Sequence, residues 1–270
     1  MPELPEVETV ARGLNQRIAG DFIESVWLGS KPEPMKSPAP EIASALESKT
    51  ISSVHRVGKH IVFDMSSSNG SNANAQWIVH LGMTGSLRVV SPDAPVEKHT
   101  HAILKLSSGR ELRFVDPRRF GRLSVIENFQ APGSEPLHIS LEDFAKLFRN
   151  RKTPIKSALL NQKLLSGVGN IYADEALFRA KIRPRRRAAS LNKDELRRLH
   201  SALKKVLNEA IRAGGSSISD YVDANGDEGF FQLKHRVYGR EAKSCLACKT
   251  PIKRIVIAGR SSHYCPHCQK

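Results

Sequence analysis

The sequence has no apolar run that approaches the roughly 20 residues needed to cross a bilayer as a helix. Its start also lacks the charged, apolar and small-residue pattern of a secretory signal peptide. The first absence argues against a membrane protein, and the second gives no reason to expect an oxidising compartment. We therefore expect a soluble chain that works in the cytoplasm.

Acidic residues are few compared with basic ones. The chain has 42 Lys and Arg against 27 Asp and Glu, a formal net charge of +15 at pH 7. This balance suits a polyanionic partner better than an acidic metabolite or a neutral protein. The excess is also uneven, because residues 230–270 contain nine Lys/Arg with one acid, Glu241, and residues 181–187 contain five. One such run alone would indicate a solvated surface, but the two together favour nucleic acid.

Cysteine is scarce, and all of it lies near the C-terminus. The four residues form two C-x2-C pairs separated by sixteen residues, a spacing typical of a tetrahedral zinc site. Four protein ligands leave no open position for catalysis, so we expect one structural zinc per chain. Disulfides are the alternative, disfavoured without an oxidising compartment. His263 and His267 could serve as ligands only in place of a lost cysteine. The predicted ligands are Cys245, Cys248, Cys265 and Cys268.

The segment between the two cysteine pairs predicts a β-hairpin. Residues 252–257 and 263–264 have the composition of strands, and Gly259 and Arg260 lie in the turn. A zinc-bound hairpin with a basic tip suits the backbone of duplex DNA. Because zinc ribbons occur in many kinds of protein, this feature by itself predicts only nucleic-acid binding.

The 270 residues are enough for two domains, and the pattern changes once along the chain. Residues 6–18 place apolar side chains on one face of a helix that Gly20 ends. Seven strand-like segments separated by Pro-, Ser- and Asn-rich breakers follow and predict a β-sandwich. These segments are residues 22–28, 51–57, 60–65, 77–81, 87–90, 102–106 and 111–115.

After Ile126 the spacing becomes helical. Helices are expected to begin near Ser140 and Pro154, and the longest should run over residues 192–213. The segment 166–170 separates two short helices, as in a helix-turn-helix junction. The fold class is therefore predicted to be α+β, with the order helix and β-sandwich, helical domain, zinc hairpin.

The N-terminus carries two prolines and three glutamates in its first eight residues. Proline is favoured in the first turn of a helix, and acidic side chains there interact favourably with the positive end of the helix dipole. These residues could therefore simply stabilise the start of a helix, and alone they would not indicate catalysis. However, the start at residues 2–6 is followed in order by the runs at 80–87 (HLGMTGSL), 116–121 (DPRRFG), 167–173 (GVGNIYA) and 237–240 (VYGR), and by the cysteine tail. With these motifs in this order, the chain resembles the bacterial formamidopyrimidine-DNA glycosylases over nearly its full length.

The resemblance implies a bifunctional DNA glycosylase and AP lyase that removes oxidised purines, 8-oxoguanine and formamidopyrimidines, from duplex DNA. Once Met1 is removed, Pro2 presents an N-terminal amine that titrates closer to neutrality than a lysine does. It can attack the sugar C1′, expel the base and form a Schiff base. The strand is then cut by β- and δ-elimination.

The resemblance also implies the catalytic roles around Pro2. Glu3 is expected to be the general acid toward the deoxyribose ring oxygen, with Glu6 as a second carboxylate in the same pocket. Lys59 aligns with the lysine of β-elimination and Arg260 with the arginine of δ-elimination. Without the resemblance, Lys59 would be a surface lysine and Arg260 a plain phosphate contact.

A base inside a duplex must be everted before its sugar can be attacked, and the vacated space must be filled. The resemblance assigns this filling to Met83, Arg118 and Phe120. For Met83 and Phe120, packing in the protein core is an equal alternative from the residue types alone. The resemblance further assigns DNA phosphate contacts to His99, Arg151, Lys156 and Asn170, and a lesion-capping loop to residues 216–229, in which no residue is singled out.

The expected domains are a catalytic β-sandwich domain at 1–127, a linker at 128–138, a helical DNA-binding domain with a helix-two-turn-helix at 139–229, and a zinc-finger hairpin at 230–270. The expected partner is double-stranded DNA containing oxidised purines, without a membrane and with the chain as a monomer at the bacterial nucleoid. Two alternatives stay open. One is an endonuclease-VIII-type enzyme for oxidised pyrimidines. The other is a non-catalytic zinc-ribbon DNA-binding protein, which would have lost Pro2, Glu3 or Lys59.

Overall fold

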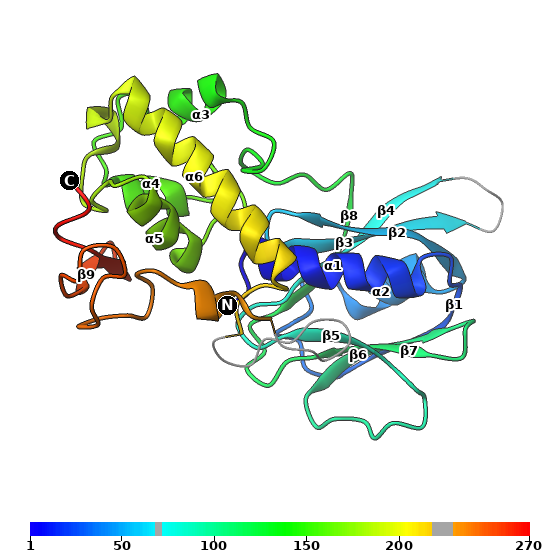
Figure 1. Cartoon of the computed structure of the whole chain (residues 1–270). Helices are drawn as coiled ribbons and strands as arrows, with labels where there is room; N and C mark the ends of the chain where they lie inside the picture. The colour runs from blue at the N-terminus through cyan, green and yellow to red at the C-terminus, as the bar shows by residue number, and fades with distance from the viewer. Residues whose placement is uncertain (68–71, 218–228) are drawn as a thin grey trace. The chain divides into compact units, whose positions relative to one another are not determined.

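The computed structural model describes residues 1–67, 72–217 and 229–270 (Figure 1). The chain divides into two compact units. One contains residues 1–130 and 214–229, and the other contains residues 131–213 and 230–270. The three domains and one linker expected from the sequence are a division along the chain, and their boundaries stay a prediction.

The first unit begins with helix α1, Leu4–Ile18. Its first turn carries a capping box, in which the side chains of Glu3 and Glu6 each accept from the other residue's main chain, and Pro5 occupies a position where its missing N–H costs nothing. The face predicted to be apolar is buried, with Leu14 and Ile18 fully enclosed. Gly20, at a φ of 93°, turns the chain into the first strand.

Two four-stranded antiparallel sheets form a sandwich in this unit. One has the order β1 (Ile23–Leu28), β6 (Thr100–Leu106), β7 (Glu111–Val115), β5 (Ser86–Val90), and the other has β2 (Lys49–Val57), β3 (His60–Ser67), β4 (Asn72–His80), β8 (Arg122–Glu127). Their inner faces bury a shared core that includes Phe63, Trp77 and Phe114. Helix α1 contacts β2, β3 and β5, and helix α2, Ala39–Leu46, contacts β1, β4 and β8 (Figure 1). The predicted β-sandwich is confirmed.

The second unit is helical and ends in the predicted hairpin. Its helices are α3 (Leu141–Phe148), α4 (Ile155–Leu160), α5 (Asn170–Arg179) and α6 (Lys193–Arg212), with short 3-10 turns at Ala188–Ser190 and Phe231–Lys234. Ser140 and Asn192 cap α3 and α6 with their side chains. Helix α5 is almost wholly buried and contacts α4, α6 and the hairpin. The α+β class with a helical region and zinc-hairpin strands is thus confirmed.

Strands β9 (Lys253–Ile257) and β10 (Arg260–Tyr264) pair antiparallel. The two residues between them, Ala258 and Gly259, have φ values of 47° and 74°, the geometry that a tight two-residue hairpin favours. Arg260 therefore stands directly after the turn, at the exposed tip. Within the described parts of the chain, no helix is both long and apolar enough to cross a membrane.

Candidate active site and DNA-contact residues

The N-terminal residues predicted to be catalytic lie at the buried start of α1. Pro2 is buried, and Glu3 and Glu6 are 4% and 2% exposed. The main-chain N–H of Glu3 donates to Oε2 of Glu6 at 2.9 Å, and that of Ser216 donates to Oε1 of Glu6 at 2.8 Å. Glu6 therefore connects the first turn of α1 to residue 216 and fixes the main chain beside Pro2.

Close backbone approaches surround this connection. Gly215 has a φ of 84°, and a Cβ there would lie 2.9 Å from Cγ of Glu6. A Cβ on Gly229 would lie 2.4 Å from the carbonyl oxygens of Gly214 and Gly215, so only glycine fits. The two ends of the segment 216–229 thus meet beside α1. The lesion-capping loop predicted there lies, at residues 218–228, outside the described residues.

Lys59 lies in the two-residue turn between β2 and β3 and is 8% exposed. His60, the next residue, faces His80 of β4 with ring centroids 5.0 Å apart. Burial lowers the pKa of His80 to about 4, helped by the nearby charges of His60, Arg122 and Lys59. His80 is therefore neutral near pH 7, and its Nδ1 accepts from the main chain of Gly82 at 3.1 Å. This bond holds the turn that leads to Met83.

The residues predicted to fill the space of an everted nucleotide are exposed. Met83 is 42% and Phe120 52% exposed, so neither belongs to the core. Arg118 is also exposed, and its Cζ lies 4.7 Å from the centre of the Phe120 ring, a cation–π arrangement. Exposed large apolar side chains next to arginine suit insertion into DNA. Their insertion stays a prediction.

One buried carboxylate joins the segments that carry these side chains. Asp116 is 0% exposed. Its Oδ1 accepts hydrogen bonds from the hydroxyl of Thr84 at 2.6 Å and from the main-chain N–H of Arg118 at 3.2 Å. Its Oδ2 accepts a hydrogen bond from the main-chain N–H of Gly121 at 2.7 Å. A Cβ on Gly82 would lie 2.5 Å from the main chain of Phe120. Sequence reasoning quoted Asp116 in a motif but gave it no role.

The residues predicted to contact DNA phosphates differ in their surroundings. His99 and Arg151 are exposed, and Asn170, the first residue of α5, is partly buried with its Nδ2 3.3 Å from the hydroxyl of Ser261. Arg260 is exposed next to Ser261. The second unit therefore brings Asn170 and the hairpin tip together, while His99 belongs to the first unit.

Lys156 has a different environment from the one expected of a phosphate contact. It is 0% exposed, and its Nζ lies 2.7 Å from Oδ1 of Asp174 and donates to the carbonyl of Ser261 at 2.6 Å. The other oxygen of Asp174 accepts the N–H of His263 at 2.8 Å. These bonds hold β10 against α4 and α5. A direct contact of Lys156 with DNA stays a prediction, and it would require the ammonium to give up these partners.

Glu175, the neighbour of Asp174 on α5, is a second buried carboxylate that sequence reasoning missed. Its Oε1 accepts three consecutive main-chain N–H groups, those of Arg236, Val237 and Tyr238, at 2.9 to 3.0 Å. Burial raises the pKa of Glu175, against the lowering effect of these hydrogen bonds. It fixes the VYGR segment before the cysteine pairs, and no sequence signal pointed to this pairing.

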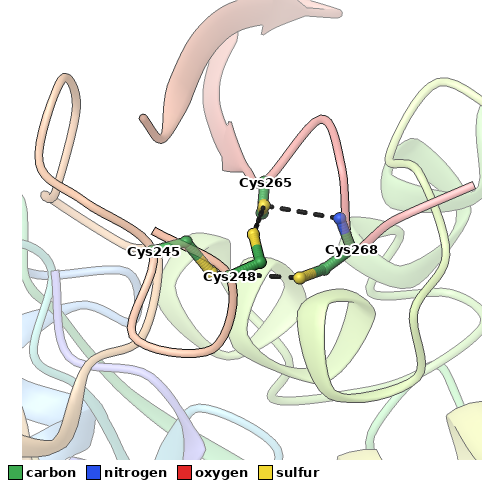
Figure 2. Close-up of side chains that lie close together, drawn as sticks. All are labelled: Cys245, Cys248, Cys265 and Cys268. Carbon is green, nitrogen blue, oxygen red and sulfur yellow. Dashed lines mark hydrogen bonds between the residues drawn. The ribbon is translucent and has the colours of Figure 1, made fainter. Parts of the chain in front are cut away.

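The four cysteines come together as predicted (Figure 2). All four Sγ atoms lie within 4.8 Å of one another, with 3.9 Å between Cys245 and Cys268 and 3.4 Å between Cys248 and Cys265. A tetrahedral zinc with four sulfur ligands places them about 3.8 Å apart. No disulfide joins any of the four cysteines. The site fits one structural zinc, and four sulfur ligands leave no position for a substrate.

Loss of the zinc is expected to weaken DNA binding. We expect one zinc per chain, and Cys265→Ser should lower both the zinc content and the affinity for duplex DNA, the latter by about tenfold or more, because metal binding supplies the folding energy of such a module. Metal analysis and fluorescence anisotropy measure the two. His267→Ala, beside Cys268 but outside the sulfur cluster, is the control and should keep its zinc. Clearly less than one zinc on fresh protein, or intact affinity in Cys265→Ser, would contradict the assignment.

Three family models match consecutive parts of the chain. They are described as formamidopyrimidine-DNA glycosylase N-terminal domain, over residues 1–123, formamidopyrimidine-DNA glycosylase H2TH domain, over residues 131–222, and zinc finger found in FPG and IleRS, over residues 243–270. Together they cover most of the sequence.

Curated relatives match over the whole chain. The formamidopyrimidine-DNA glycosylase of Solibacter usitatus is 47% identical over 279 residues, and that of Herpetosiphon aurantiacus is 43% identical over 278 residues, each covering 100% of both chains. Among solved structures, a complex of Lactococcus lactis Fpg with DNA containing an abasic site has a TM-score of 0.90 at 35% identity, covering 99% of each chain. The MutM (Fpg) protein of Thermus thermophilus has a TM-score of 0.87 at 41% identity, covering 99% of this chain and 98% of that one.

Proposed function

Because the chain belongs to the formamidopyrimidine-DNA glycosylase family, we propose that it removes oxidised purines from duplex DNA and then cuts the strand as an AP lyase. The observation that carries this proposal is the full-length match to that family together with a buried Pro2-Glu3 start. Similar structures contain DNA with an abasic site, Fapy-dG or a carbocyclic 8-oxo-G. These ligands support oxidised purines as the substrate class.

The reaction we propose begins at the nitrogen of Pro2. Its lone pair forms a bond to C1′ while the bond from C1′ to the base breaks, and the base leaves with that electron pair and takes up the proton that the proline nitrogen loses. Glu3 gives a proton to the ring oxygen as the sugar opens. The product is an iminium ion, which makes the C2′ proton acidic. Loss of that proton expels the 3′ phosphate, and a second elimination expels the 5′ phosphate. Lys59 and Arg260 are assigned to the β- and δ-steps.

We assign filling of the space left by the everted nucleotide to Met83, Arg118 and Phe120, whose exposure on the first unit supports this role. His99, Arg151 and Asn170 are assigned to phosphates of the duplex, which fix its position without reading its sequence. Base excision and β-elimination would then rely on residues 1–127, while the zinc hairpin at 230–270 would supply Arg260 for δ-elimination and, with residues 139–229, help to hold the duplex. We further propose that the chain works on the nucleoid in the bacterial cytoplasm.

Borohydride trapping on a duplex with 8-oxoguanine opposite cytosine tests the proposal. Reduction of the iminium should give a covalent protein–DNA band, and peptide mapping should place the DNA on residue 2. A parallel duplex with an oxidised pyrimidine tests the endonuclease-VIII alternative. No band on the purine duplex, or a stronger band on the pyrimidine duplex, would reject the proposed substrate. DNA binding without any band would favour a non-catalytic binding protein.

Arg118 is expected to read the base opposite the lesion. Its guanidinium presents only donors, and an orphaned cytosine offers the neighbouring acceptors O2 and N3, whereas adenine offers N1 beside a competing N6 donor. Excision opposite cytosine should exceed excision opposite adenine by about 1–3 kcal/mol, roughly 5- to 150-fold. Arg118→Ala should lose this preference under single-turnover conditions.

Arg119→Ala is the matched control for this measurement. Arg119 is the exposed neighbour, and it already pairs with Glu33 at 2.6 Å, so its loss should leave the preference intact. Equal parent rates opposite the two bases, or an undiminished preference in Arg118→Ala, would show that Arg118 does not read the opposite base.

A further inference from the structure

The four first-unit residues that we assign to insertion into the duplex or to its phosphates, Met83, His99, Arg118 and Phe120, all lie in segments that are hydrogen-bonded to Asp116. The carboxylate accepts hydrogen bonds from the hydroxyl of Thr84, the neighbour of Met83, and from the main-chain N–H groups of Arg118 and of Gly121, the neighbour of Phe120. The main-chain N–H of Asp116 also donates to the carbonyl of His99 at 2.9 Å. One buried residue thus joins three loops that are separate along the chain.

The chemistry of these contacts requires a carboxylate. All three groups that face its oxygens act as donors there, one hydroxyl and two N–H groups, and an ionised carboxylate is the side chain that only accepts. An asparagine of the same shape would turn an NH2 group toward at least one of these donors. Hydrogen bonds to a charged acceptor are also shorter and stronger than neutral ones.

The arrangement leaves little freedom to the loops that Asp116 joins. Gly82, at a φ of 65°, packs directly against the main chain of Phe120 and Gly121, and a Cβ on Gly121 would lie 2.5 Å from the ring of Phe114. His80 holds the same turn from the other side through Gly82. The carbonyl of Asp116 faces Nε2 of the buried His101 at 3.0 Å. Asp116 is therefore anchored to the sandwich itself.

We propose that Asp116 is the positioning residue that sets Met83, Arg118 and Phe120 as one rigid group, and that it thereby determines how strongly the enzyme discriminates the base opposite the lesion. The inference rests on the proposed function, because it takes insertion of these side chains as given. Asp116 acts through its neighbours, because its side chain is fully buried and its carboxylate accepts hydrogen bonds from Thr84, Arg118 and Gly121.

The experiment separates insertion into the duplex from bond chemistry. An 8-oxoguanine duplex requires both, whereas a single-stranded oligonucleotide with an AP site has no opposite base and no stacked duplex into which the three side chains would insert. We expect Asp116→Asn to lower single-turnover excision from the duplex by at least tenfold and to reduce the cytosine-over-adenine preference toward that of Arg118→Ala. Cleavage of the single-stranded AP site should stay within about twofold of the parent.

Thr84 gives a milder test that does not depend on the folding of Asp116→Asn. Thr84→Val keeps the shape but removes the hydroxyl that donates to Asp116, so it should reproduce the duplex defect and the lost preference. Thr84→Ser restores the hydroxyl and should restore both. Asp64→Asn is the control. Asp64 lies on β3 and accepts hydrogen bonds from the side chains of Ser53 and Gln76, away from the loops that Asp116 joins.

The outcomes are distinguishable. Full duplex activity and full base preference in Thr84→Val would overturn the positioning role, as would an equal loss on duplex and single-stranded substrates with an unchanged melting temperature. If the parent itself forms no borohydride-trapped complex, the proposed function fails instead.

Discussion

A chain in which the nitrogen of Pro2 stays acylated, by Met1 or by an N-terminal tag, is expected to lose both base excision and strand cleavage. The lone pair of an amide nitrogen is delocalised into its carbonyl, so it cannot form the bond to C1′. A free N-terminal amine titrates near neutrality and is partly unprotonated at pH 7. Product formation on 8-oxoguanine and AP-site duplexes should fall below detection.

The same tagged protein supplies its own control. Mass spectrometry first establishes which N-terminus is present, and cleavage of the tag to leave Pro2 as the first residue should restore both activities. Duplex affinity, measured by fluorescence anisotropy, should change little, because the phosphate contacts proposed for His99, Arg151 and Asn170 lie elsewhere in the sequence. Full activity with the tag intact would reject proline as the nucleophile.

The sandwich could be predicted from the sequence because most of its strands alternate apolar and polar residues or contain short apolar runs that must be buried. Two elements could not be predicted in this way. Helix α2 lies behind a proline-rich stretch, yet Pro40 stands in its first turn, where proline is tolerated. Strand β8 is an edge strand in which only Leu123 is fully buried and Val125 is partly buried against the core, so its alternation spans too few residues to stand out in the sequence. In both cases the local composition does not indicate that the segment packs against the sandwich.

The site could be predicted where its chemistry is local in the sequence. Cys245 and Cys248 are close neighbours along the chain, so their spacing alone indicated a metal site, and the structure brings the second pair to them. The bonds of Lys156 could not be predicted, since its partner Ser261 is 105 residues away. The same holds for Asp116 and Thr84, which lie 32 residues apart. A single sequence carries no information on such pairings.

The second large effect is expected from Glu3→Gln, which should separate the two activities. Glutamine has the same shape and keeps an oxygen that can accept in the capping box, so the first turn of α1 should survive. It cannot donate a proton to the ring oxygen, and general acid catalysis is worth about 10²- to 10⁴-fold. Excision of 8-oxoguanine should fall by that factor. An AP site has no base to expel, and its sugar already equilibrates with the open aldehyde without an acid, so its cleavage should fall far less.

Glu8→Gln is the matched control, because Glu8 lies on the same helix and pairs with Arg12 at 2.6 Å and Arg56 at 2.7 Å. It should leave both activities near those of the parent. Single-turnover rates on 8-oxoguanine and AP-site duplexes, measured side by side, decide between the roles of Glu3. An equal fall on both substrates would indicate that Glu3 only supports the helix start beside Pro2. Unchanged excision would remove Glu3 from the proton transfer, and the acid would then have to be sought among the other groups near Pro2, beginning with Glu6.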